Sequence, residues 1–262
     1  MKPWPYRRNR ILRQIGEHAY ASVTDLARKL NCSAMTIRRD LARLAAEGRL
    51  ERSHGGASAT RMVRLEFAVA ERAGTCAAEK AAIARAAAKL VGAGQRLIID
   101  IGTTTLALAR ELRPRQDLAV VTPSLAVVSV LLGAPGIECM LLGGTVRETS
   151  PDLHGPLLEE NLSRIHTDWA FVGCDGLSAA GGLTAADPRT ARSTALMIGC
   201  AAKAALLTDS TKAGSDSFIR FARWEDLDYL VTDGAMPREV LDAAAAAGVQ
   251  VITVSAEQGE QA

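Results

Sequence analysis

Two adjacent arginines stand out among the side chains that could do chemistry, because they sit in the short stretch SAMTIRRDL, residues 33–41. A guanidinium group offers five N–H donors in a fixed fork, which matches the oxygens of a phosphate and the acceptor edge of guanine. Residues 1–60 hold 12 Lys and Arg against 5 Asp and Glu, a net charge of +7, whereas the other 202 residues hold 19 against 24. This division of charge indicates that the basic N-terminal part binds a polyanion.

The segment around these arginines predicts three short helices. The first covers about 6–18, and the second begins at Ser22, which forms a capping-box-like S-x-x-D with Asp25. Asn31 follows where a tight turn needs a residue that tolerates positive φ, and Ser33 is placed to cap the third helix. Two helices separated by about three residues have the spacing of a helix-turn-helix.

The third helix has two distinct faces. Ile37, Leu41 and Leu44 repeat at i, i+4 and i+7, which predicts one buried stripe. The opposite side and its flanks carry Met35, Thr36, Arg38, Arg39 and Arg43. An isolated arginine pair is more often solvated surface charge, but here the caps, the turn and the local net charge all favour DNA binding. Gly48 is predicted to end this helix. The following residues predict a short strand at 50–53 and the tip of a β-wing at 54–57.

A family resemblance rests on these same residues. The run TDLARKLNCSAMTIRRDLARLAAEGRLERSHGGA, residues 24–57, resembles the N-terminal winged helix-turn-helix of DeoR-family bacterial transcription regulators, which carry TIRRDL together with HGGA. The resemblance implies that residues 21–40 form the DNA-reading unit and that the third helix lies in the major groove.

Two kinds of contact with double-stranded operator DNA are expected from this arrangement. The candidates for base edges are Met35, Thr36, Arg39 and Arg43. The candidates for phosphate contacts are Arg7, Arg8, Arg10, Lys29, Arg52 and His54. Ser33 and Arg38, at the N-terminal turn and on the flank of the third helix, complete the predicted DNA-binding set. His54 could equally be a turn residue.

A different pattern begins after the basic part. Residues 61–76 show no sustained period and predict a linker that is partly helical. From Ala77 onward, buried strands alternate with helices, which predicts a mostly parallel sheet covered by helices. The predicted strands are 96–101, 118–122, 137–142, 168–173, 204–208, 228–232 and 249–254. The predicted helices are 77–91, 104–112, 124–132, 156–164, 189–201 and 237–246.

Small polar segments recur where these strands end. The candidate ligand-binding residues there are Asp100, Gly102, Thr103, Thr104, Thr105, Ser124, Gly144, Asp175 and Lys212. Any one such segment alone is more often a capping turn, but five of them favour a pocket at the carboxyl ends of the strands. The GTTT segment that follows Asp100 could hold an anion through backbone N–H groups, hydroxyls and a helix dipole. Lys212 is the natural cation for an anionic substituent, and Asp175 the natural acceptor for sugar hydroxyls.

The same part of the chain resembles the C-terminal sensor of DeoR-family regulators through DIGTTT, LLGG, GCDG with a downstream GGLT, and DSTK. The resemblance implies a fold related to phosphopentose isomerases, a phosphorylated sugar or related metabolite as effector, and a pocket lined by the candidates above other than Ser124. The chain departs from the family pattern at Pro123, where many relatives have Asn, and at 189–195, which lack the acid and the lysine of relatives. Related isomerases need such groups for proton transfer, so their absence argues against catalysis.

Several other classes of site are disfavoured. The chain has no GxxxxGK[ST] or HExxH motif, and the stretch around Gly92 and Gly94 lacks the third glycine of a dinucleotide site. The five cysteines are scattered without CxxC or paired histidines, which indicates reduced thiols and no metal site. The N-terminus lacks an apolar signal segment, and the most apolar stretch, 125–142, is broken by glycine and proline. We therefore expect a cytoplasmic protein with no cofactor and no membrane partner.

One hypothesis and one alternative follow. We expect residues 1–60 to form a small winged helix-turn-helix, 61–76 a linker, and 77–262 a larger, mostly parallel α/β domain for effector sensing and oligomerisation. Such a chain would repress carbohydrate-metabolism genes under the control of a small anionic carbohydrate effector. The alternative is a sugar-phosphate isomerase-like enzyme with an accessory nucleic-acid-binding module. Helix-turn-helix proteins commonly bind as dimers, so we expect a homo-oligomer, with dimer and tetramer both open.

Overall fold

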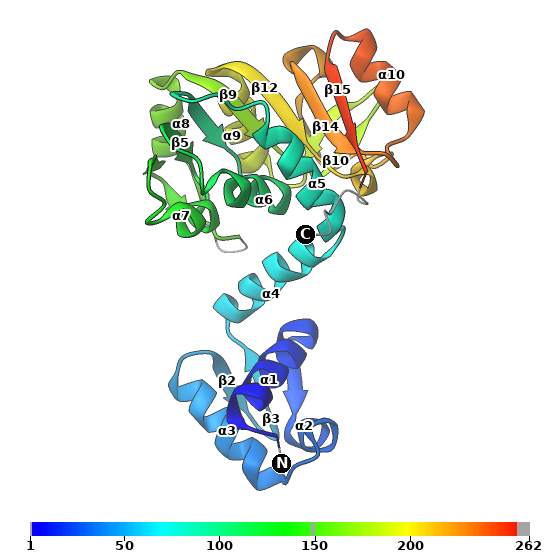
Figure 1. Cartoon of the computed structure of the whole chain (residues 1–262). Helices are drawn as coiled ribbons and strands as arrows, with labels where there is room; N and C mark the ends of the chain where they lie inside the picture. Colours follow the sequence, from blue (N-terminus) through cyan, green and yellow to red (C-terminus); the bar gives the residue numbers. More distant parts are fainter. Residues whose placement is uncertain (1, 148–149, 256–262) are drawn as a thin grey trace, which may run out of the picture. The chain divides into compact units, whose positions relative to one another are not determined.

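The computed structural model describes residues 2–147 and 150–255, and the chain divides into two compact units (Figure 1). Residues 1–75 belong to the first unit, and residues 76–147 and 151–262 to the second. The predicted sensor domain extends to residue 262, and its last part, 256–262, lies outside the described residues. The segment predicted as a linker folds as helix α4, Arg61–Gly74, while the predicted domain bounds stay a prediction.

Helices and a small antiparallel sheet make up the first unit. Besides α4, its elements are α1 (Trp4–His18), β1 (Tyr20–Ser22), α2 (Val23–Leu30), α3 (Ala34–Ala46), β2 (Leu50–Ser53) and β3 (Gly56–Ala59). In the sheet, β3 lies between β1 and β2. The three predicted helices and the first wing strand are confirmed. The wing tip is shorter than predicted, because only residues 54 and 55 form the turn and Gly56 already belongs to β3.

Local signals explain where these helices begin and end. Ser22 Oγ accepts a hydrogen bond from the N–H of Asp25 at 3.0 Å, and Ser33 Oγ accepts one from the N–H of Thr36 at 3.2 Å. Both serines are therefore N-caps, as predicted. Asn31 ends α2 in the left-handed conformation with φ 48°. The core beneath the helices includes six large side chains that are at most 2 % exposed, namely Ile11, Ile15, Leu26, Ile37, Leu41 and Leu44.

A seven-stranded parallel sheet forms the centre of the second unit. Its strands are β4 (Arg96–Ile99), β5 (Leu118–Thr122), β6 (Ile137–Leu141), β9 (Thr167–Val172), β12 (Ala201–Leu207), β14 (Tyr229–Asp233) and β15 (Gln250–Val254). They lie in the order β15-β14-β12-β9-β4-β5-β6, and every neighbouring pair is parallel. The sequence predicts all seven strands, and the mostly parallel α/β fold is confirmed.

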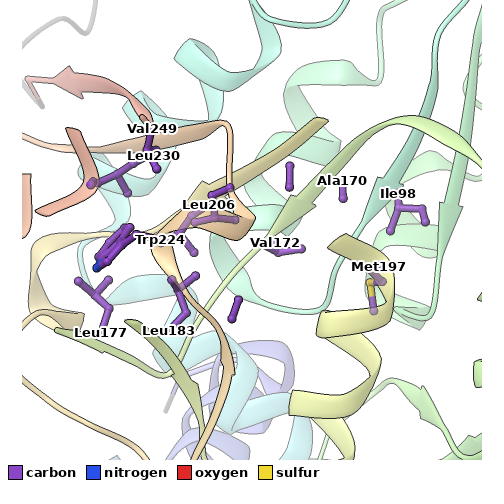
Figure 2. Close-up of a cluster of buried hydrophobic side chains, with 14 of the residues drawn as sticks. Ile98, Ala170, Val172, Leu177, Leu183, Met197, Leu206, Trp224, Leu230 and Val249 are labelled. Carbon is purple, nitrogen blue, oxygen red and sulfur yellow. The ribbon is translucent and has the colours of Figure 1, made fainter. Parts of the chain in front are cut away.

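Helices cover both faces of this sheet. One face packs against α5 (Ala77–Ala88), α6 (Thr103–Leu112) and α7 (Leu125–Leu131), and the other against α8 (Pro156–Ser163), α9 (Pro188–Gly199) and α10 (Arg238–Ala246). The core under α5, α6 and α7 is called the first core, and the core under α8, α9 and α10 the second core. Neighbouring residues of a strand point to opposite faces of the sheet, so Leu97 and Ile99 of β4 join the first core and Ile98 joins the second core (Figure 2). No helix within the described residues is both long enough and apolar enough to span a membrane.

Several short strands lie outside the main sheet. β10 (Gly176–Ser178), β11 (Gly182–Ala185) and β13 (Ile219–Ala222) form a small antiparallel sheet whose Leu177 and Leu183 join the second core (Figure 2). β7 (Thr145–Val146) pairs with β8 (Leu153–His154). The sequence analysis predicts none of these five strands. β7, β8 and β10 hold only two or three residues, too few to show a period, and β11 and β13 lie outside the alternation of helices with parallel strands. Residues 145–147 and 150–154 are together called the β7–β8 hairpin.

The direction of the strand order reverses at one place in the seven-stranded sheet. β4 and β9 are neighbours at its middle; β5 and β6 continue on the side of β4, whereas β12, β14 and β15 continue on the side of β9. Ligands of open α/β sheets bind outside the carboxyl ends of the strands at the point where the strand order reverses. The residues that follow β4 and β9 are therefore the first place to look for a ligand site.

Candidate DNA interface and effector site

Helix α3 buries one face and exposes the other, as the sequence predicts. Ile37 and Leu44 are fully buried, whereas the side chain of Met35 is 63 % exposed. Arg38 and Arg39 are both exposed, and neither side chain makes a hydrogen bond or ion pair with another described residue. Two exposed guanidinium groups without a partner among the described residues are available for contacts with phosphates or base edges.

Arg43 differs from Arg39, although both lie on the exposed side of α3. The Nε atom of Arg43 is 3.2 Å from Oε1 of Glu47, and its guanidinium carbon lies 4.6 Å from the centre of the Trp4 ring. These contacts hold Arg43 at the C-terminal end of α3, whereas recognition helices read bases with their N-terminal residues. To contact a base, the Arg43 side chain would have to break both interactions. The Arg39 side chain has no hydrogen bond or ion pair with a described residue to break.

Arg7 is not available to DNA, which corrects the predicted phosphate contact. Its side chain is buried, with Nε and Nη2 donating to the two carboxylate oxygens of Asp40 at 2.6 and 2.9 Å. Its Nη1 donates to the carbonyl oxygen of Lys2 at 2.6 Å. Helical spacing explains the burial, because Arg7 lies four residues before Ile11 and Asp40 three residues after Ile37, both on inward faces. The pair ties α1 to the middle of α3.

The other predicted phosphate contacts lie at or near the surface of the first unit. The exposed ones are Arg10, Lys29, Arg52 and His54. Arg52 lies in β2, the strand that follows α3, and His54 lies in the wing turn directly after that strand. Arg8 is half-buried, and its Nε is buried without a partner among the described residues. Phosphate contacts by these residues stay a prediction.

In the second unit, a carboxylate is buried where β4 and β9 end. Asp100 is 2 % exposed; its Oδ1 accepts from the N–H of Ile101 at 2.7 Å. Its Oδ2 accepts from the N–H of Gly173 at 3.4 Å and from the hydroxyl of Thr194 at 3.2 Å. Burial raises the pKa of Asp100 to about 7, against which these three hydrogen bonds act. A buried carboxyl group that titrates near neutral pH is a candidate functional group.

Charged side chains centred on Arg147 bind the β7–β8 hairpin to α9. Its Nε and Nη2 donate to the carboxylate of Asp152 at 3.3 and 2.7 Å. Its Nη1 donates to the hydroxyl of Thr190 at 2.7 Å and to Asp187 at 3.4 Å. Asp187 also accepts from the backbone N–H and the guanidinium of Arg189, and the hydrogen bonds from Arg189 hold the pKa of Asp187 well below its usual range.

A pocket opens between Asp100, the β7–β8 hairpin and α9. Its polar lining consists of Asp100, Asp152, His154, Thr190, Ser193 and Thr194. Its apolar lining consists of Ile101, Pro123, Leu153 and Met197. In the part of the chain that the structure describes, no group of three or more His, Cys, Asp or Glu side chains is arranged to hold a metal ion. The pocket offers hydrogen-bond donors and acceptors beside a small apolar wall.

A second charged group lies at the end of β12. Lys80 of α5 is 6 % exposed, and its Nζ is 3.7 Å from Oδ2 of Asp209. Burial lowers the pKa of Lys80, and the nearby ammonium of Lys212 acts in the same direction. Asp233 accepts from the N–H of Ser210 at 2.6 Å and so holds the turn that carries Lys212. The predicted cation Lys212 thus stands near a buried lysine that the sequence analysis missed.

Comparison with known proteins covers both units. The family model of the DeoR-like helix-turn-helix domain matches residues 7–62, and that of the DeoR C terminal sensor domain matches residues 75–234. The chain belongs to the DeoR family. The putative aga operon transcriptional repressor of Escherichia coli O157:H7 is 32 % identical over 252 residues, which cover 95 % of this chain and 93 % of that protein. The HTH-type transcriptional regulator GlpR of Haloferax volcanii is 35 % identical over 246 residues, which cover 94 % and 96 %.

Solved structures show a weaker likeness. Ribose 5-phosphate isomerase A of Methanocaldococcus jannaschii is 18 % identical over 51 % of this chain and 53 % of that chain, with a TM-score of 0.39. The relatives that span nearly the whole chain are transcription regulators. This DeoR-family chain is therefore a DNA-binding transcription regulator, and the relatives give no support to the isomerase-like alternative.

The effector residues predicted for this DeoR-family chain do not all meet in one place. Of the predicted set, Asp100 lines the pocket. Thr105 needs correction: it is fully buried, and its hydroxyl donates to the carbonyl oxygens of Asp100 at 2.9 Å and Gly102 at 3.1 Å, so it closes the turn before α6. Ser124 is the N-cap of α7, and its Oγ accepts from the N–H of Val127 at 3.3 Å.

Gly144 has a structural reason to be glycine. Its φ is 152°, and a Cβ there would lie 2.8 Å from the carbonyl oxygen of His154, so only glycine fits the close approach within the hairpin. Asp175 is exposed, and its Oδ2 accepts from the N–H of Ala186 at 2.8 Å. Ligand contacts stay a prediction for Gly102, Thr103, Thr104, Gly144, Asp175 and Lys212.

Both departures from the DeoR pattern meet in the pocket. Pro123 lines it, and so do Thr190, Ser193 and Thr194 from the part of α9 that lacks an acid and a lysine. Thr194 donates to the carboxylate of Asp100, which therefore has a neutral hydroxyl partner at this position. The pocket thus includes residues from both places where the sequence analysis finds a departure from the family pattern.

Proposed function

We propose that this DeoR-family regulator represses carbohydrate-metabolism genes by binding double-stranded operator DNA through α3, and that a small sugar-phosphate-like effector controls this binding from the second unit. The observation that carries the proposal is the exposed N-terminal half of α3, where Arg38 and Arg39 contact no other described residue through a hydrogen bond or ion pair. The relatives' names, a repressor of one operon and a regulator, support repression as the mode of action.

The contacts to DNA divide by position on the first unit. The residues proposed to read base edges are Met35, Thr36 and Arg39, in the first half of α3. The residues proposed for phosphates are Ser33, Arg38, Arg52 and His54. The buried Arg7–Asp40 pair holds α3 against α1, so the reading face is presented by a rigid body. Each bidentate pair of an arginine with guanine contributes about 1–3 kcal/mol of discrimination between bases.

A homo-oligomer belongs to the same proposal. Helix-turn-helix proteins bind two half-sites whose centres are about 34–36 Å apart, which requires two copies of the reading helix. We assign self-association to the second unit, because the first unit is small and its basic surface is used for DNA. A dimer and a tetramer both satisfy this requirement.

The anionic group of the effector is proposed to bind at the start of α6. Gly102 occupies the N-cap position with φ 139°, and no side chain caps this helix. Thr103 and Thr104 follow, and the helix dipole favours an anion at this end. Lys212, with Lys80 near it, supplies positive charge at another strand end. The effector controls DNA binding only if its affinity differs between DNA-competent and DNA-incompetent states.

Two linked measurements test the proposal on the full chain. A thermal-shift screen of sugars, sugar acids and their phosphates finds ligands, because a compound that binds the folded state raises its apparent stability. A gel shift with the promoter DNA that flanks the gene of this protein then asks whether each hit changes DNA binding. We expect at least one phosphorylated compound to raise the midpoint and to release the DNA. The proposal of effector control fails if every compound that raises the midpoint leaves DNA binding unchanged, or if none raises it.

A further inference from the structure

The pocket between Asp100, the β7–β8 hairpin and α9 is rich in hydrogen-bonding groups and poor in available positive charge. Its polar lining comes from three elements, namely Asp100 after β4, Asp152 and His154 of the hairpin, and Thr190, Ser193 and Thr194 of α9. The hydrogen bonds that these side chains already make decide what they can still offer a ligand.

His154 offers a hydrogen-bond donor that is not satisfied. Its Nε2 lies 3.2 Å from Nη1 of Arg189, and a guanidinium only donates, so Nε2 is the acceptor and the ring proton lies on Nδ1. The Nδ1 atom is buried and has no hydrogen-bond partner among the described residues. A buried N–H without a partner is unfavourable, and an oxygen atom of a bound ligand would satisfy it.

The two carboxylates of the lining offer acceptors. Asp100 accepts three hydrogen bonds, two from backbone N–H groups and one from Thr194, and a carboxylate has about four acceptor positions. Asp152 accepts two hydrogen bonds, both from Arg147. Both carboxylates therefore retain lone pairs for hydroxyl donors. The hydroxyl oxygen of Thr190 accepts from Arg147, which leaves its proton to be donated.

The positively charged side chains near the pocket already form ion pairs with aspartates. Arg147 is ion-paired with Asp152 at 2.7 Å and with Asp187 at 3.4 Å. Arg189 is ion-paired with Asp187 at 2.6 Å. The two arginines balance these two aspartates, and no Lys or Arg in the described part of the chain is paired with Asp100. Above about pH 7, where the Asp100 carboxyl group is ionised, an anionic group of a ligand placed here would face its negative charge in a poorly solvated space, which is unfavourable for both charges.

We propose that this pocket binds the uncharged, hydroxyl-bearing end of the effector and rejects a carboxylate or phosphate at that end. The inference rests on the proposed function, in which the anionic group of the effector binds elsewhere, at the start of α6. A polyol satisfies both kinds of group, because its oxygens accept from Nδ1–H of His154 and its protons go to Asp100 and Asp152. A carboxylate would satisfy His154 but would repel Asp100. Among phosphorylated compounds, the pocket therefore favours those whose other end is a hydroxyl group over those whose other end is a carboxylate.

The test compares ligands that differ only at the end assigned to the pocket. Titration calorimetry on the full chain at about pH 8, where Asp100 is mostly ionised, compares three kinds of ligand. They are sugar-alcohol monophosphates of four to six carbons, the matched aldonic acid monophosphates, in which the terminal CH₂OH is a carboxylate, and inorganic phosphate. We expect at least one sugar-alcohol monophosphate to bind about tenfold more tightly than its matched aldonate. Asp100→Asn removes the repelling charge, so the preference should fall to within about threefold.

A second variant provides a test that does not depend on whether Asp100→Asn folds. His154→Phe removes a donor that either ligand would use, so both affinities should fall and their ratio should stay near that of the wild type. An aldonate monophosphate that binds the wild type as tightly as the matched alcohol overturns the inference and leaves effector control standing. A preference that persists in folded Asp100→Asn also overturns it. Binding by none of the three ligand classes overturns the proposed sugar-phosphate effector together with this inference.

Discussion

Replacing Asp100 with asparagine removes a buried carboxyl group whose ionisation opposes folding. Burial raises the pKa of Asp100 from 3.8 to about 7 in the folded protein, and the unfolded chain leaves it near 3.8. The folded state therefore binds more protons than the unfolded state between about pH 4 and pH 7, so the free energy of unfolding of the wild type falls as pH rises through this window. A shift of about three pKa units corresponds to about 4 kcal/mol, which is present below this window and lost above it.

Asparagine keeps an acceptor for the N–H of Ile101 and has no charge to bury, so the variant lacks this pH dependence. We expect the unfolding free energy of the variant minus that of the wild type to rise by up to about 4 kcal/mol between about pH 4 and pH 8. Urea titrations followed by tryptophan fluorescence measure the difference, because Trp169 and Trp224 are both buried in the second unit. Taking the difference at each pH cancels the groups that the two proteins share.

Asp168→Asn is a matched control with the opposite sign. The backbone N–H of Arg96 donates to Asp168 at 2.7 Å, and this bond together with the Arg96 guanidinium lowers the pKa of Asp168. The wild type is therefore stabilised above the unfolded pKa of Asp168 and loses that stability as pH falls through the folded pKa. For Asp100→Asn, a difference that stays constant between about pH 4 and pH 8 would refute the reasoning, because the buried carboxyl would then ionise like an exposed one.

Three further predictions concern named contacts. Asp40→Leu leaves the buried Arg7 guanidinium without its partner and should cost the first unit about 3–5 kcal/mol, most of which Arg7→Met in the same chain should restore. A double variant no more stable than Asp40→Leu in thermal unfolding would contradict this. Gly144→Ala should cost about 1–3 kcal/mol in urea titrations, because its φ of 152° and the His154 carbonyl exclude a Cβ. Gly133→Ala, with φ 72° and no atom within 4 Å, should cost about 1 kcal/mol, and equal losses would argue against the close approach. Lys212→Ala should weaken a phosphorylated ligand about tenfold in calorimetry, whereas Lys203→Ala, an exposed lysine over the Trp169 ring at 5.3 Å, should not. An unchanged affinity would remove Lys212 as the partner of the anion.

Features that depend on neighbours within one or two turns of helix can be predicted from the sequence. The caps at Ser22 and Ser33 act on N–H groups three residues away, and Asn31 ends α2 through its own φ. The buried stripe of α3 follows from the spacing of Ile37 and Leu44. Buried strands of four or more residues that alternate with helices can also be predicted, because an apolar run and the residues that bound it are local features of the sequence.

Pairings between distant elements are what the sequence leaves open. Arg7 and Asp40 are 33 residues apart, and Arg147 and Thr190 are 43 apart, so no local rule selects these partners. The burial of Arg7 could have been predicted, since it lies four residues before Ile11, but its partner could not. The same holds for Lys80, which lies three residues before the fully buried Ile83. The effector pocket is built from such long-range pairings, which is why Asp152 and His154 escape the sequence analysis.

One binding measurement decides whether α3 reads DNA through its exposed arginines. Fluorescence anisotropy on the full chain would compare the operator with a random duplex of equal length, for the wild type, Arg39→Ala and the control Arg13→Ala, an exposed arginine paired with Glu17 on α1. We expect Arg39→Ala to lose about 1–3 kcal/mol on the operator, or roughly 5- to 150-fold, with a much smaller loss on the random duplex and little change for Arg13→Ala. Equal losses on both duplexes, or none on the operator, would contradict base reading by this helix.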